Sequence, residues 1–279
     1  MKLAVVYNSR SGSALSRHEL DAAFAEANIT VATFIDITKS SPASLKRLAS
    51  RYSTIAAYGG DGTICSVADA VAGTRTTLAP LPGGTLNHFT KDLGIPQDLS
   101  EAIRRLSSAK AKDIDIAEVN GKAFVNNSSI GFYPSSLRER SRLEKHLGKW
   151  PAAVFASIRS FVKFQIYELS LDNKTIRTPF VFIGNNVYDS SDGMARHHVN
   201  KGVLSVYAVR STKRRTLFKL LALALVNRVD DADELQSFTT KELRVTTRRS
   251  RLRVATDGEH ELMKPPLRYV SRAGALKVL

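Results

Sequence analysis

Two glycine-rich turns carry the residues of this chain that are best placed for chemistry. Each turn follows a short apolar run that predicts a buried strand, over residues 54–58 and 77–81, and each precedes a predicted helix. Glycine lets the backbone turn tightly and bring bare N–H groups up to an anion, and a helix N-terminus adds a partial positive charge. The carboxyl ends of parallel strands meet at the sheet edge where open α/β sheets bind ligands. The sequence therefore predicts an anion-binding edge built from Gly59-Gly60-Asp61-Gly62-Thr63 and Gly83-Gly84-Thr85-Leu86-Asn87.

Asp61 is the acidic residue of the first turn. A carboxylate beside a triphosphate would be repelled unless a cation lay between them, so we expect Asp61 to bind Mg²⁺. Asp61 could instead be an Asx-type turn residue, because Gly and Asp are common in turns. Asn87 could hydrogen-bond either the ligand or its own loop. The expected anion cradle consists of backbone and hydroxyl groups of Gly59, Gly60, Gly62, Thr63, Gly84 and Thr85.

The two turns together form a pattern, Gly-Gly-Asp-Gly-Thr followed by Gly-Thr-x-Asn-x-Phe, that is much more specific than either turn alone. With this pattern, and with Leu93-Gly94-Ile95-Pro96 and Asp257-Gly258-Glu259 farther on, the sequence resembles the diacylglycerol kinase catalytic-domain family. That family includes bacterial soluble lipid kinases and the sphingosine and ceramide kinases. The resemblance covers nearly the whole chain and implies an ATP-dependent, Mg²⁺-requiring kinase that phosphorylates a lipid hydroxyl, on a diacylglycerol-like or sphingosine-like acceptor.

The resemblance also implies roles for residues outside the glycine turns. It makes Glu259 the proton acceptor from the lipid hydroxyl, and it places Thr38 and Asn8 beside the nucleotide. Asn8 matches the start of a family motif whose proline is missing here. Without the resemblance, Asp257-Gly258 predicts only a hairpin turn and Thr38 only a turn residue.

Three departures from the family pattern remove negative charge from places where the family binds metal. His88 stands where the family has an acid, Cys65-Ser66 replace Asn-Glu, and Lys201 replaces the acid of a peripheral metal site. Two alternatives therefore stay open: a lipid- or nucleotide-binding protein with little catalysis, and an NAD kinase-like phosphotransferase, because Gly-Gly-Asp-Gly is shared with that group.

Strand and helix patterns alternate as far as about residue 110, which predicts a parallel sheet with helices on both faces. Short β-branched runs follow, at 122–126, 168–172, 175–184, 203–209, 241–247 and 252–256, as an antiparallel sandwich would give. We therefore predict an α/β domain over 1–118 and a β-sandwich domain over 119–279. The resemblance implies that the first binds nucleotide and the second the lipid substrate, in an NAD kinase/diacylglycerol kinase-like fold. A final strand over 275–279 could return to the first domain. Helical patterns at 135–164 and 213–226 interrupt the β part, and the second fits either a docked helix or a membrane-surface helix.

The charge of +15 is the outstanding feature of the composition. A basic protein seeks phosphates, and since no nucleic-acid-binding module is recognisable and the basic residues are spread along the chain, we expect an anionic membrane surface as partner and no nucleic acid. No run approaches the roughly 20 apolar residues of a membrane span. The single cysteine, Cys65, favours a reducing cytoplasm and is expected to be a packed residue. A homodimer remains open.

Overall fold

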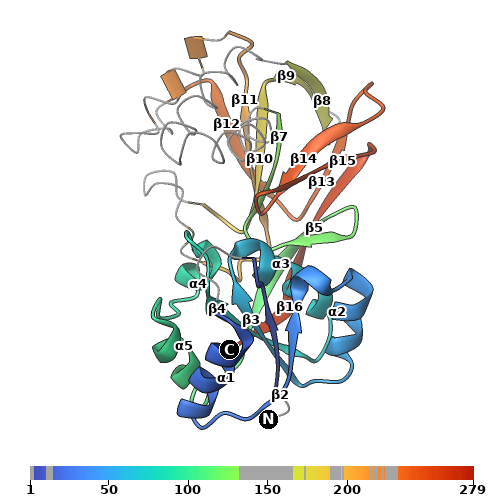
Figure 1. Cartoon of the computed structure of the whole chain (residues 1–279). Coiled ribbons are helices and arrows are strands. Elements are labelled where there is room, and N and C mark those ends of the chain that lie inside the picture. Colours follow the sequence, from blue (N-terminus) through green and yellow to red (C-terminus); the bar gives the residue numbers. More distant parts are fainter. Residues whose placement is uncertain are drawn as a thin grey trace, which may run out of the picture.

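In the computed structural model an α/β part and a mainly antiparallel β part are joined by one shared sheet (Figure 1). The structure describes residues 3–10, 15–131, 166–172, 174–188, 196, 198–213, 215–216, 219–220, 223 and 232–279. The segment predicted to be helical over 135–164 lies outside the described residues, as does much of 213–226. Among the described residues, no helix is long and apolar enough to cross a membrane.

The N-terminal part is an alternation of parallel strands and helices, with the strands in the order β2-β1-β3-β4. In Figure 1, α2 and α3 lie together on one side of these strands, and α1, α4 and α5 gather on the other. Strand β3 is buried along its whole length, as expected for the centre of a parallel sheet. The elements are β1 (Leu3–Tyr7), α1 (Arg17–Glu26), β2 (Val31–Asp36), the 3₁₀ turn η1 (Ile37–Lys39), α2 (Pro42–Ala49), β3 (Thr54–Gly59), α3 (Asp61–Val71), β4 (Thr77–Pro82), α4 (His88–Asp92) and α5 (Leu99–Arg105).

The C-terminal part is built from strands of two sheets, with a second apolar core between them. One is a six-stranded antiparallel sheet, β12-β11-β10-β7-β14-β15, and the other continues the N-terminal sheet through β16, β13, β8 and β9. The strands are β5 (Lys112–Val119), β6 (Lys122–Phe124), β7 (Asn127–Gly131), β8 (Tyr167–Leu171), β9 (Lys174–Thr178), β10 (Phe180–Asn185), β11 (Leu204–Val209), β12 (Leu235–Thr240), β13 (Glu242–Thr246), β14 (Leu252–Thr256), β15 (Glu259–Met263) and β16 (Leu267–Val278). The predicted fold class, a parallel α/β unit followed by a mainly antiparallel β unit, is confirmed.

Strand β16 runs through both parts of the molecule. Residues 267–270 pair with β13, and residues between Tyr269 and Val278 pair with β5. Val278 also pairs in parallel with Leu78 of β4. The strand predicted over 275–279 is thus the end of a longer strand. Leu276 and Val278 are fully buried in the N-terminal core, although they are among the last residues of the chain.

Several predicted boundaries were wrong for local reasons. The sequence predicts a helix over 99–108 with Ser100 or its rival Asp98 as N-cap; Asp98 caps α5, because its carboxylate accepts a hydrogen bond from the Glu101 amide at 2.9 Å. The run 175–184 forms two strands, since Pro179 lies between β9 and β10 and has no N–H to continue a ladder. Helix α1 begins at Arg17, later than the predicted Ser13. Strands β7, β12 and β15 were not predicted.

We predict that Leu276→Ala lowers the free energy of unfolding by about 2–5 kcal/mol, because it leaves a cavity in a buried position between β4 and β5. Urea denaturation followed by circular dichroism measures this loss. The neighbouring Lys277 is exposed, and Lys277→Ala serves as the control with an expected change within about 0.5 kcal/mol. Equal effects of the two substitutions would contradict the structural role of the last residues of β16.

Candidate active site

The two glycine turns lie against each other, backbone to backbone. A methyl group on Gly84 would be 2.5 Å from Gly60 Cα, and one on Gly83 would be 2.8 Å from the Gly59 nitrogen. The Gly83 amide donates to the Gly59 carbonyl at 3.1 Å. Because no side chain fits between the turns, their backbones are in direct contact at the carboxyl ends of β3 and β4. The structure therefore brings the two predicted halves of the cradle together.

Helix α3 begins directly at the first turn, with Gly60 as its N-cap and no side-chain cap. The amides of Asp61 and Gly62 belong to the first turn of the helix, where no intrahelical carbonyl can accept from them. Thr63 is buried, and its hydroxyl accepts a hydrogen bond from Asn8 Nδ2 at 3.3 Å. Asn8 at the end of β1 is thereby fixed beside the start of α3. This helix terminus has the polarity and bare amides that bind a phosphate.

The Asp61 carboxylate holds the second turn in place. Its two oxygens accept the amides of His88 and Phe89, at 3.2 and 3.0 Å, at the start of α4. Each carboxylate oxygen retains a further acceptor position, so the half-buried side chain still fits one ligand of a Mg²⁺ ion that is otherwise bound by phosphates and water. In the described part of the chain, no group of three or more His, Cys, Asp and Glu side chains could hold a metal. A metal here would therefore depend on the phosphates of a ligand.

Asn87 stabilises its own loop. Its backbone is left-handed, with φ of 52°, and its side-chain oxygen accepts the Gly84 amide at 2.9 Å. Of the two roles open from the sequence, the structure shows the contact with the loop. Thr85 and Leu86 between them are exposed, and Leu86 is one of the large apolar side chains that extend into solvent.

Thr38 lies at the end of β2, in a polar cluster around Asp36. Asp36 Oδ1 accepts the Thr38 amide at 3.0 Å and its hydroxyl at 2.9 Å, while Asp36 Oδ2 accepts the Ser9 hydroxyl at 2.7 Å. Burial raises the pKa of Asp36, but these hydrogen bonds outweigh it and lower the pKa below its ordinary value. Since β1 pairs with both β2 and β3, the cluster is at the same sheet edge as the first glycine turn.

Glu259 reaches the first glycine turn from the C-terminal part. Asp257 and Gly258, with φ of 46° and 87°, form the two-residue turn between β14 and β15. Glu259 follows this turn, and its Oε1 is 3.7 Å from where a methyl group on Gly62 would lie. The side chain is 63% exposed, which leaves its carboxylate accessible to a substrate. Residues almost 200 positions apart in the chain thus face each other across one cleft.

Asp257 anchors this turn. Its half-buried carboxylate accepts three backbone amides, from Val125 at 2.7 Å, Asn126 at 2.8 Å and Asn127 at 3.0 Å. Burial raises the pKa of Asp257 although these bonds act to lower it. These hydrogen bonds hold Asp257 against the segment that joins β6 to β7. They therefore fix the turn from which Glu259 extends.

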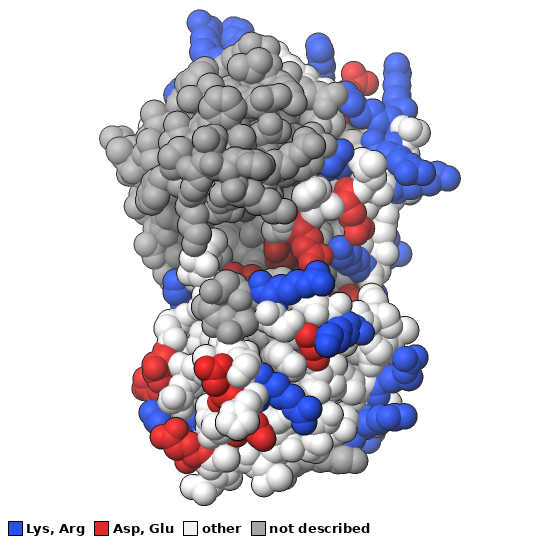
Figure 2. All heavy atoms as spheres, viewed as in Figure 1, with Lys and Arg blue, Asp and Glu red and all other residues white. Residues whose placement is uncertain are grey.

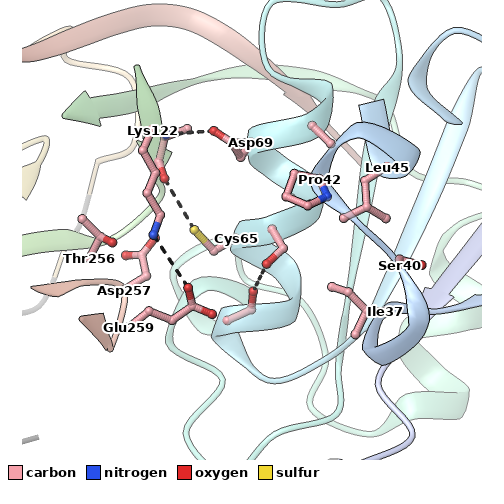
Figure 3. A pocket seen from close by; sticks show the side chains of 14 residues that line it. Ile37, Ser40, Pro42, Leu45, Cys65, Asp69, Lys122, Thr256, Asp257 and Glu259 are labelled. Atoms are coloured by element: carbon pink, nitrogen blue, oxygen red, sulfur yellow. Dashed lines mark hydrogen bonds and ion pairs between the residues drawn. The ribbon is translucent and has the colours of Figure 1, made fainter. Parts of the chain in front are cut away.

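A cavity of about 310 Å³ lies beside the start of α3 (Figure 3). Glu259, Asp257 and Lys122 lie on one wall, α3 contributes Cys65 and Asp69 next to them, and Ile37, Pro42 and Leu45 close the far side. The cavity is polar near Glu259 and apolar near α2. It is continuous with the first glycine turn through Gly62, which lines it.

Lys122 is a residue of this site that sequence reasoning missed, because no motif marks it. Its ammonium is 2.9 Å from Glu261 and 3.9 Å from Glu259. Burial lowers the pKa of Lys122, but the hydrogen bond to Glu261 and the charges of both glutamates outweigh it and raise the pKa. Lys122 therefore stays charged and attracts Glu259 at the mouth of the cavity.

Cys65 has the properties of a packed residue. Its thiol donates to the Ala123 carbonyl at 3.8 Å. Burial, with the nearby charge of Asp257, raises the pKa of Cys65 well above its ordinary value, so the reactive thiolate is disfavoured.

The turn at Lys201 is held by hydrogen bonds from its backbone. The Lys201 amide donates to Asn186 Oδ1 at 2.7 Å, and the Gly202 amide donates to the buried carboxylate of Asp115, which also accepts the Gly274 amide at 2.9 Å. The Asp115 carboxylate therefore already accepts two backbone amides. That arrangement and the exposed Lys201 ammonium both disfavour a cation there.

Comparison with known proteins finds similar sequences and similar folds. Residues 2–119 match the family model of the diacylglycerol kinase catalytic domain. The "Probable lipid kinase YegS-like" protein of Pseudomonas aeruginosa PAO1 is 46% identical over 87 residues, which are 30% of this chain and 28% of that protein. Its counterpart in Pseudomonas putida KT2440 is 37% identical over 127 residues, which are 44% of this chain and 42% of that protein. Less than half of either relative is therefore matched.

Solved structures extend the likeness in fold to the whole chain. The crystal structure of a diacylglycerol kinase from Bacillus anthracis Sterne has a TM-score of 0.69 at 19% identity, covering 99% of this chain and 96% of that one. A second structure from the same organism has a TM-score of 0.76 at 21% identity with the same coverage. At these identities the likeness shows the fold. The match to the family model is therefore what assigns residues 2–119 to the diacylglycerol kinase catalytic domain family.

Proposed function

We propose that the protein is an ATP-dependent lipid kinase that transfers the γ-phosphate of ATP to a lipid hydroxyl, on a diacylglycerol-like or sphingosine-like acceptor. The observation that carries this proposal is the position of Glu259, whose carboxylate faces Gly62 at the bare N-terminus of α3. An anion cradle and a solvent-accessible carboxylate on opposite walls of one cleft are what phosphoryl transfer to an alcohol needs. The family match over residues 2–119 supports a kinase.

In this proposal the phosphates of ATP bind to the first-turn amides of α3 and to the second glycine turn. Asp61 would provide one ligand of Mg²⁺, which neutralises phosphate charge when bound. The nucleoside fits the adjoining cavity, whose apolar end near Leu45 suits a planar base. Asn8 and the Thr38 cluster would border the nucleotide from the ends of β1 and β2.

Glu259 then acts as the general base. It accepts the proton of the lipid hydroxyl while the hydroxyl oxygen forms a bond to the γ-phosphorus, and the bond from that phosphorus to the β,γ-bridging oxygen breaks to release ADP. Lys122 and Asp257 hold Glu259 at this place, the first by charge and the second through its turn.

We infer that the lipid is reached at an anionic membrane surface. The chain has 41 basic and 26 acidic residues. Residues 1–118 contain 13 basic and 12 acidic residues, and residues 119–279 contain the other 28 basic and 14 acidic residues. The basic residues are spread along the chain as predicted, but nearly the whole net charge belongs to the C-terminal part. Figure 2 shows this on one face, where blue and red mix over the lower part while blue predominates at the upper edges.

A nucleotide- or lipid-binding protein with little turnover is the second candidate. It is favoured by the two amides that already occupy Asp61 and by His88, which stands where the family has an acid. Incubation with labelled ATP, Mg²⁺ and either a mixed-lipid extract or NAD distinguishes the candidates. A labelled lipid identified by mass supports the proposal, labelled NADP supports the NAD kinase-like alternative, and no transfer supports the binding protein.

For Glu259→Gln we predict a fall in turnover of about 10² to 10⁴, because the base is lost while size and hydrogen bonding are kept. Affinities for ATP and lipid should change little, since the interaction is made in the transition state. Steady-state kinetics measure both. The matched control is Glu261→Gln, which removes the other carboxylate beside Lys122 and should retain most of the turnover. Full activity of the Glu259 variant would assign the base elsewhere.

For Gly60→Ala we predict a folded protein that binds ATP at least about tenfold more weakly. The backbone of Gly60 is extended, with φ of −76°, and an added methyl group would meet Gly84 Cα at an ordinary 3.6 Å, so only a closely approaching ligand should be displaced. Gly84→Ala should instead destabilise the protein by about 1–3 kcal/mol, because its methyl group overlaps the Gly60 backbone. Calorimetric titration with ATP and thermal melts measure the two effects. Unchanged ATP affinity of Gly60→Ala would remove the cradle from the proposal.

Binding to anionic vesicles should depend on the C-terminal part. We predict that simultaneous replacement of Lys213, Arg214 and Arg215 by Glu weakens sedimentation with phosphatidylglycerol vesicles, since each basic residue near the surface contributes about 1 kcal/mol. The same change at Lys46, Arg47 and Arg51, which are exposed at and just after α2, is the matched control and should have a smaller effect. Salt should reverse the binding. Equal binding to neutral and anionic vesicles would contradict the electrostatic role.

A further inference from the structure

Arg196 is a buried cation that the proposed reaction does not use. Only 4% of the residue is exposed. Its Nη2 and Nε atoms donate to Asp92 Oδ2, at 2.7 and 3.0 Å. Nη1 donates to the carbonyl groups of Val125 and Asn185, and Nη2 also donates to Asn126 Oδ1. A cation with this many partners and almost no contact with water is costly to bury unless each partner is in place.

The partners of Arg196 belong to opposite walls of the candidate active site. Asp92 is the last residue of α4, and the first amides of α4 bind the Asp61 carboxylate of the first glycine turn. Val125 and Asn126 lie between β6 and β7, in the loop that holds Asp257. Asp92 is thus connected through α4 to the first glycine turn, and the loop is connected through Asp257 to the turn that precedes Glu259.

One peptide group connects Arg196 to the turn before Glu259. The carbonyl of Val125 accepts from Arg196, and the amide of Asn126, in the same peptide group, donates to Asp257 at 2.8 Å. That peptide dipole therefore lies between a buried cation and a carboxylate, each of which strengthens the hydrogen bond of the other. The link from Asp92 to Glu259 consists of one ion pair, one peptide group and one two-residue turn.

We propose that Arg196 and Asp92 form a positioning pair, which sets the separation of the first glycine turn and Glu259. This rests on the proposed function only as far as Glu259 is the base. Neither residue contacts the reacting atoms, and both act through α4 and the loop over 125–127. A displacement of about 1 Å between a base and its substrate can cost about 10² in rate, so a pair that fixes this separation controls turnover without binding either substrate.

The competing interpretation is a pair that contributes to stability alone. Replacing a buried ion pair by apolar residues of similar volume often restores stability, whereas removing one partner does not. The double variant Asp92→Leu/Arg196→Met therefore separates the two interpretations. If the pair only stabilises, the double variant regains turnover together with stability; if it positions, stability returns while turnover stays low.

The experiment compares Asp92→Asn, Arg196→Lys and the double variant with the wild-type protein. We expect kcat to fall by about 10² in each folded variant, while the Kd for ADP changes less than about threefold. In parallel, spin labels at Ser108→Cys and Ser250→Cys, in a Cys65→Ser background, report the distance between the N-terminal and C-terminal parts by pulsed electron resonance. Both label sites are exposed, one in each part of the molecule. We expect the distance distribution to widen at least about twofold in the variants.

The matched control is Glu242→Gln, which removes an exposed ion pair with Arg268 at 3.0 Å and should change neither readout. Recovery of both turnover and a narrow distance distribution in the double variant would overturn the proposal. The proposal would also be overturned if the folded single variants matched the wild-type protein in turnover and in distance distribution. If the wild-type protein transfers no phosphate, the proposed function fails and the distance measurement alone decides: a widened distribution supports the positioning pair and an unchanged one overturns it.

Discussion

The absence of space between two backbone turns is the constraint on which the candidate site depends. Gly60 and Gly84 approach so closely that even a methyl group on Gly84 would overlap the opposite chain. This contact fixes β3, β4, α3 and α4 relative to one another at one edge of the sheet. At the same edge the amides of Asp61 and Gly62 in the first turn of α3 have no intrahelical acceptor, and amides of this kind can bind an anion without loss of side-chain entropy. The close packing of the two turns therefore also shapes the candidate anion site.

The opposite wall of the cleft depends on polar interactions between distant segments. Asp257 gathers three amides of the loop over 125–127, and Arg196 binds the carbonyl side of the same loop. Strand β16 adds a covalent connection, because it begins in the C-terminal core and ends beside β4. The two walls are thus joined both by one continuous strand and by a charged network that borders the cleft. In the proposed function, these two connections would align the lipid acceptor with the nucleotide.

The net charge is distributed unevenly between the N-terminal and C-terminal parts of the molecule. Residues 1–118 are nearly neutral, and residues 119–279 carry almost all of the net charge of +15. Near the cleft acidic groups gather: the Asp61 and Asp257 carboxylates accept backbone amides, and Glu259 lies 3.9 Å from the Lys122 ammonium. In the proposed function, attraction to an anionic surface and binding of phosphate would therefore depend on different residues.

The sequence alone determined the features that depend on neighbouring residues. Glycine turns between strand and helix patterns located the phosphate edge, and Asp257-Gly258 indicated a hairpin, because backbone freedom and turn chemistry are local. Local reasoning failed where two residues competed for one role, as with Asp98 and Ser100, and where a buried strand was polar: Ser128 and Ser129 in β7 are fully buried, although they show no apolar alternation. Only the tertiary structure placed Glu259 opposite Gly62, Lys122 beside Glu259 and Arg196 between the two walls. Those contacts join segments far apart in the chain, and they form only when the strands between them have packed.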